Sequence, residues 1–188
     1  PRAPLCCGRG PDRGCWLNTE ACWCSDSPNY IGSGMRRCKA GMAIAKASWD
    51  ILFEDGEKAL MALDSGVVTE AFENVVEANT LLSGLGFLNT GLATAHGIHS
   101  GLTVLPETHK YLHGEKVAFG IVCQMVLENT PAETVDKVMR FMVAIGLPVT
   151  LADLGAAAER DQVMARAETP AHGPLTHPDP VPLTDARD

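Results

Sequence analysis

The chain has no long apolar run and no cluster of basic residues. No stretch approaches the roughly 18 consecutive apolar residues that cross a bilayer, and no apolar signal segment follows a basic start in the first thirty residues. The 15 Lys and Arg residues are scattered and face 23 Asp and Glu, so the formal net charge is −8. Because phosphate backbones are bound by grouped basic side chains, we expect a soluble, cytoplasmic protein with no nucleic-acid or membrane partner.

The cysteines also lack the spacing of a zinc ribbon or finger. Six of the seven lie in the first 38 residues, and only Cys123 lies beyond them. The sequence has no paired CxxC clusters and no CxxC followed by a pair of histidines. We interpret the cysteines as reduced thiols.

Composition divides the chain into a middle part and two different ends. Residues 1–34 are rich in Gly, Pro, Cys and Ser, which indicates an irregular leader. Residues 168–188 contain five prolines, too many for a helix or a central strand, so we expect a disordered tail there. The residues between them, 35–167, are long enough to bury one core, and we expect one domain.

The spacing of apolar residues predicts helices along this middle part. Apolar positions recur every three or four residues, and the two-residue alternation of a strand is absent. Thr69 and Glu70 suit a helix start, Gly84 and Gly86 suit a stop, and Asp55-Gly56 suits a bend or break in the first long helix. The expected fold is an all-α helical bundle with helices over residues 35–63, 67–82, 92–104, 114–127, 132–145 and, more weakly, 156–167.

Four of the six histidines, His96, His99, His109 and His113, lie within eighteen residues. In one continuous helix His96 and His113 would be roughly 26 Å apart, but Pro106 interrupts the helix. The chain therefore turns near residues 105–107, and the two imidazoles can meet at one cation. Other interpretations stay open, because histidines three residues apart are more often polar surface, or hydrogen-bonded core residues that bind no metal, than a ligand set.

Three segments of the sequence resemble glycerol dehydrogenases of the iron-containing alcohol dehydrogenase superfamily. These are EANTLLSGLGF at residues 77–87, GLATAHGIHSGLT at 91–103 and HGEKVAFG at 113–120. The similarity extends from about Trp16 to Leu154 and corresponds to the family's C-terminal helical domain. The dehydroquinate synthases share this architecture, but the GLATAHGIH pattern favours the polyol enzymes.

The resemblance implies a metal site and a reaction. Two of the family's three protein ligands are histidines and fall on His96 and His113, whereas His99, His109 and Lys116 receive no ligand role. The metal would be zinc, with Fe(II) also compatible, and would lower the pKa of a polyol hydroxyl. Glycerol would be oxidised to dihydroxyacetone with NAD as hydride acceptor, in a complete enzyme that forms a homo-oligomer.

The chain departs from the family in two places. The family's third ligand is an aspartate five residues before a Trp, where this chain has Pro11; Asp12, one position along, is at best a weak third ligand. No Gly-x-Gly-x-x-Gly loop opens a βαβ unit, so we expect the NAD-binding domain to be missing. We therefore expect a C-terminal fragment, inactive alone, whose ends reflect a shifted reading frame or a truncated gene. The alternative is a non-catalytic helical interaction or metal-binding module.

Overall fold

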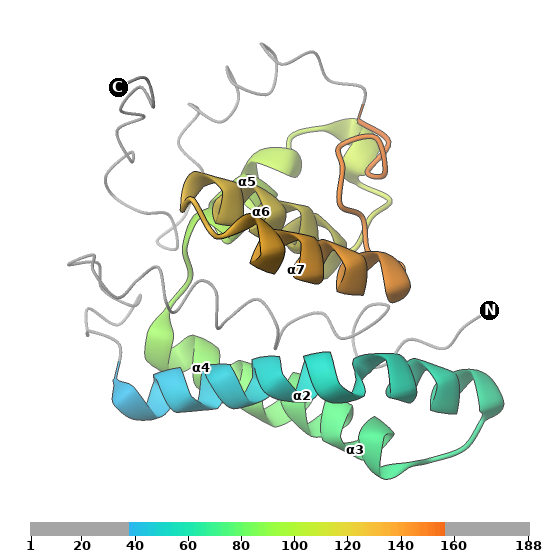
Figure 1. Ribbon diagram of the computed structural model, residues 1–188. Coiled ribbons are helices and arrows are strands. Elements are labelled where there is room, and N and C mark those ends of the chain that lie inside the picture. The colour runs from blue at the N-terminus through green and yellow to red at the C-terminus, as the bar shows by residue number, and fades with distance from the viewer. Residues whose placement is uncertain (1–37, 157–188) are drawn as a thin grey trace.

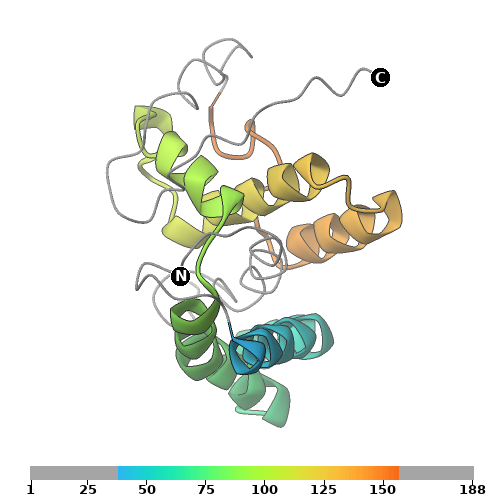
Figure 2. The same ribbon diagram turned by 90° about the vertical axis from the view of Figure 1, so that its left-hand side faces the viewer.

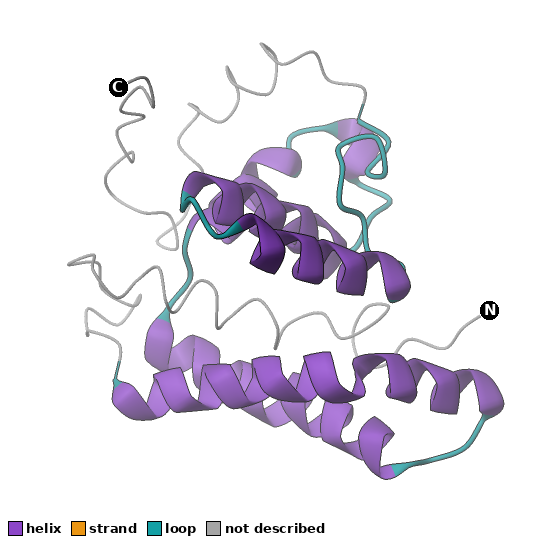
Figure 3. Ribbon diagram, viewed as in Figure 1, coloured by secondary structure: helices purple, strands orange, loops and turns teal. Residues whose placement is uncertain are grey.

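The computed structural model describes residues 38–156 of the chain, and this part is built from helices joined by short turns (Figure 1). Figure 3 shows no strand between residues 38 and 156, so the prediction of an all-α fold is confirmed. The α-helices are α2 (Lys39–Ser65), α3 (Glu70–Glu77), α4 (Ser83–Thr90), α5 (Thr94–Leu102), α6 (His113–Leu127) and α7 (Ala132–Ala144), with a π-helical turn η1 (Ala78–Leu82) and a 3-10 turn η2 (Pro106–Thr108).

The helices lie in two layers, which Figures 1 and 2 show from two directions. In one layer α2 packs against α3 and α4, and in the other α6 packs against α5 and α7. One apolar core joins them, because Leu52 of α2, Ile121 of α6 and Met142 of α7 are all fully buried in it. The rings of Phe53 and Phe141, whose centroids are 4.5 Å apart, add a contact between α2 and α7.

The long helix α2 runs unbroken, so the prediction of a bend or break at Asp55-Gly56 is wrong. Gly56 is buried beneath the ring of Phe141, where a Cβ atom would lie only 2.9 Å from Cζ. The Asp55 carboxylate accepts hydrogen bonds from Lys58 and from Asn74 of α3. Both residues therefore take part in packing α2, and their low helix propensity does not end the helix.

The second helix begins where the sequence predicts but ends later. The side chain of Thr69 accepts a hydrogen bond from the Phe72 amide and caps α3. The helical path then continues through the π-helical turn η1 into α4, so the predicted stop at Gly84 and Gly86 is wrong, and the path ends at Gly91. Packing of α4 against α2 keeps the two glycines helical.

The remaining described helices agree with the sequence to within two residues at most ends. Helices α5, α6 and α7 correspond to the predicted ranges 92–104, 114–127 and 132–145. Pro131 lies immediately before α7, as expected for a proline at a helix start. None of the helices between residues 38 and 156 is long and apolar enough to cross a bilayer.

Several sequence predictions fall outside the described residues. These are the leader at 1–34, Asp12, almost all of the weak helix at 156–167 and the proline-rich tail at 168–188. The division of the chain into the three segments 1–34, 35–167 and 168–188 stays a prediction.

Candidate metal centre

Two packed helices bring three histidines together. His96 and His99 lie one turn apart on α5, and α6 begins at His113. Between them, Leu105 is extended and Pro106 opens the 3-10 turn η2, so that α6 returns alongside α5. The ring centroids of His96 and His113 are 5.2 Å apart. The structure therefore places together the two residues that the sequence singled out, by the turn that Pro106 suggested.

His99 belongs to the same cluster and is bonded to His113. The His113 Nδ1 and His99 Nε2 atoms are 3.0 Å apart, which is a hydrogen-bond distance, and the two ring centroids are 4.2 Å apart. The family resemblance gave His99 no ligand role. Its spacing carried the signal, because residues three apart on a helix share a face and His99 had to lie beside His96.

The spacing of His96 and His113 suits a shared cation. At a metal-to-nitrogen distance of about 2.1 Å, two imidazoles on a tetrahedral zinc ion have ring centroids about 5 Å apart. The observed 5.2 Å matches this value. His99 is 6.4 Å from His96 between centroids, and its Nε2 lies closer to His113 than the roughly 3.3 Å between nitrogens on one tetrahedral ion. The ring separation is thus compatible with two imidazoles on one ion, and His99 is hydrogen-bonded to one of the two rings.

The surroundings keep His99 uncharged. Burial is the main cause that lowers the pKa of His99 to about 3, and positive charge on His113, Lys116 and His96 lowers it further. Lys116 is itself buried on α6. At neutral pH His99 is therefore a neutral imidazole, with one nitrogen able to donate and the other able to accept a hydrogen bond.

The packing of α5 on α6 fixes the position of the cluster. A Cβ atom on Gly120 would lie 2.5 Å from the carbonyl oxygen of Ala95. The helices α5 and α6 therefore approach each other more closely than a residue with a side chain at position 120 would allow. Fully buried Gln124 of α6 adds a polar link, because its Oε1 accepts a hydrogen bond from the Ala95 amide at 2.9 Å. Since Ala95 precedes His96, both contacts set where the His96 side chain starts.

Other predicted or potential ligands lie elsewhere. His109 Nε2 contacts the carbonyl oxygen of Thr103 at 2.9 Å, at the end of α5. Asp12 lies outside the described residues. Within residues 38–156, no group of three or more His, Cys, Asp and Glu side chains is arranged to hold a metal ion.

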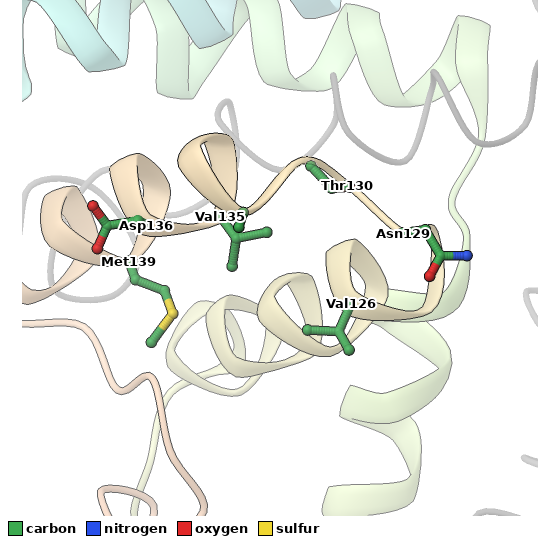
Figure 4. A pocket seen from close by; sticks show the side chains of 7 residues that line it. Val126, Asn129, Thr130, Val135, Asp136 and Met139 are labelled. Carbon is green, nitrogen blue, oxygen red and sulfur yellow. The ribbon is translucent and has the colours of Figure 1, made fainter. Parts of the chain in front are cut away.

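A separate groove lies between the end of α6 and the start of α7 (Figure 4). It encloses about 460 Å³, and no histidine contributes to it. Apolar side chains such as Val126 and Met139 line it together with Asn129 and Asp136. We do not assign it to the metal centre, because none of the clustered imidazoles reaches it.

The chain is similar to known dehydrogenases, although no family model matches it. It is 43% identical over 182 residues to a glycerol dehydrogenase of Citrobacter freundii, which covers 96% of the chain and 49% of that protein. The solved structure of a probable glycerol dehydrogenase from Sinorhizobium meliloti 1021 gives a TM-score of 0.78 at 45% identity. That match covers 82% of this chain and 43% of the solved chain. The solved structure of the glycerol dehydrogenase from Schizosaccharomyces pombe gives a TM-score of 0.81 at 40% identity. That match covers 88% of this chain and 43% of the solved chain.

These matches confirm the resemblance of the three sequence segments. The chain spans about half the length of the curated relative, and it spans 43% of the length of each of the two solved chains. Identity of 40–45% extends over more than four fifths of the chain, and the helical fold is the same in the solved structures. The chain is therefore a homologue of glycerol dehydrogenases over about half of their length.

Proposed function

We propose that this chain is the metal-carrying helical part of an NAD-dependent polyol dehydrogenase, which oxidises glycerol to dihydroxyacetone. The observation that carries the proposal is the 5.2 Å separation of the His96 and His113 rings, held by α5 and α6. The relatives' name supports glycerol as the substrate. Zinc is the proposed metal, and Fe(II) is compatible with the same nitrogen donors.

The bound cation would supply Lewis-acid polarisation of a polyol hydroxyl, which lowers the pKa of that hydroxyl. The chain's own residues have the task of presenting the cation. His96 contributes its ring from the half-buried face of α5, and His113 contributes its ring from the first position of α6. His113 is exposed at its position, so one side of the centre is open to a small substrate.

In this proposal the third ligand and the NAD site lie outside residues 38–156. Asp12 is the candidate carboxylate within the chain, one position beyond Pro11. About half of the Citrobacter freundii relative lies outside the aligned region, and NAD binding is proposed for such a region, because the sequence has no glycine-rich dinucleotide loop. Assembly of the complete enzyme into a homo-oligomer in the cytoplasm belongs to the same proposal.

A chimeric enzyme tests the proposal. The aligned half of the Citrobacter freundii glycerol dehydrogenase is replaced by this chain, and NAD reduction is followed with glycerol as substrate after loading with zinc. We expect glycerol-dependent NADH formation that is lost in His96→Ala and in His113→Ala.

The matched control is His109→Ala, which removes an imidazole from the same stretch of chain but outside the cluster. It should retain the activity of the parent chimera. Activity that survives His96→Ala would refute the proposed centre. A folded, zinc-loaded chimera with no glycerol oxidation would refute the catalytic role and favour the alternative of a non-catalytic metal-binding module.

A further inference from the structure

The hydrogen bond between His99 and His113 has a direction if His113 binds a cation. An imidazole carries a single proton when it ligates a metal, so a ring bound through Nε2 must carry that proton on Nδ1. In this structure Nδ1 is the atom that lies 3.0 Å from His99 Nε2. The bond then runs from the His113 Nδ1–H group as donor to His99 Nε2 as acceptor.

We infer that His99 is a positioning residue, which holds the ring of His113 through Nδ1 so that Nε2 is presented to the cation. This inference rests on the proposed function, because it concerns the same centre. Metal-binding histidines commonly donate their second N–H group to a carboxylate, a carbonyl or water, which fixes the ring and its tautomer. Here the imidazole of His99 would accept that hydrogen bond through Nε2.

The position of His99 suits this task. It is half-buried on α5, one turn from His96, so the helix that supplies one ligand also orients the other. His113 stands at the exposed first position of α6. The contact at Nδ1 therefore restricts the rotation of the His113 ring.

Zinc affinity of the full 188-residue chain gives the first measurement, by competition with a chromophoric chelator. His99→Ala should weaken zinc binding by about 10–100-fold, the usual loss when such an outer contact to a ligand is removed. His99→Gln places an amide oxygen near the lost acceptor and should recover much of the affinity. The control His109→Ala should bind zinc as the wild-type chain does. Unchanged affinity in His99→Ala, or an equal loss in His109→Ala, would overturn the inference.

A second measurement needs no metal. Two-bond proton–nitrogen spectra of the zinc-free chain report which ring nitrogen of each histidine carries the proton. His113 should be in the Nδ1–H form in the wild-type chain and should shift towards the Nε2–H form in His99→Ala. If the tautomer does not change, His99 does not position His113, whatever the zinc result.

The two failures can be told apart. A wild-type chain that binds no zinc would remove the proposed centre, and the zinc-free spectra would still decide whether His99 holds the ring. Zinc binding that depends on His96 and His113 but not on His99 would keep the proposed function and remove the positioning role.

Discussion

Replacing Gly120 by alanine tests whether the contact between α5 and α6 sets the geometry of the histidine cluster. The new Cβ atom would lie 2.5 Å from the Ala95 carbonyl oxygen, and contacts below 3.0 Å are essentially never seen, so the helices must separate by at least about half an ångström. Such overpacking costs about 1–3 kcal/mol, while the higher helix propensity of alanine returns about 1 kcal/mol. We expect a net loss of about 0–2 kcal/mol in the free energy of unfolding.

Gly84→Ala is the matched control for this prediction. Gly84 is exposed on α4, and no atom lies within 4 Å of its Cβ position, so alanine there should stabilise the chain by about 1 kcal/mol. Urea unfolding followed by far-UV circular dichroism should separate the two variants by about 1–3 kcal/mol. Because Ala95 precedes His96, Gly120→Ala should also weaken zinc binding, whereas Gly84→Ala should not. Two variants of equal stability would refute the reasoning about the close approach.

Three further substitutions test individual contacts. Gln124→Met removes the acceptor of the buried Ala95 amide and should lower the free energy of unfolding by about 1–3 kcal/mol, measured by urea unfolding; an unchanged value would contradict the contact. Hydrogen bonds, chiefly from Lys58, lower the pKa of Asp55 below its ordinary 3.8, so this stabilisation is present above about pH 3.8 and is lost as the pH falls through the folded value. The difference in free energy of unfolding between the wild-type chain and Asp55→Asn should therefore shrink below pH 4. Free energies of unfolding that change with pH in the same way in both chains would contradict this prediction. Thr69→Ala removes the cap of α3 and should cost about 1 kcal/mol in thermal or urea unfolding, whereas no loss would show that the cap is dispensable.

Most helices could be predicted from the sequence because strong local signals mark their ends. Pro106 and Pro131 interrupt or start helices through their missing amide proton, and Thr69 caps α3 through its hydroxyl. Glycine was the misleading signal. Gly56 and Gly84 weaken a helix by propensity alone, yet both lie inside helical runs that tertiary packing maintains.

The candidate centre could be predicted in part. The meeting of His96 and His113 followed from a proline-induced turn between two helices, which is a matter of chain geometry. The bond from His113 to His99 depends on the rotation of two side chains, and the link from Gln124 to Ala95 depends on the register between α5 and α6. Sequence spacing fixes neither the rotamers nor the register, so these contacts needed the structure.

The central claim is that His96 and His113 share one cation, and zinc titration of the intact chain tests it most directly. The wild-type chain should bind one zinc ion per chain, and each of His96→Ala and His113→Ala should weaken that binding by more than about 100-fold, since losing a ligand costs more than losing a contact behind it. The His109→Ala chain should bind as the wild type does. Stoichiometric zinc in a chain that lacks both His96 and His113 would contradict the account.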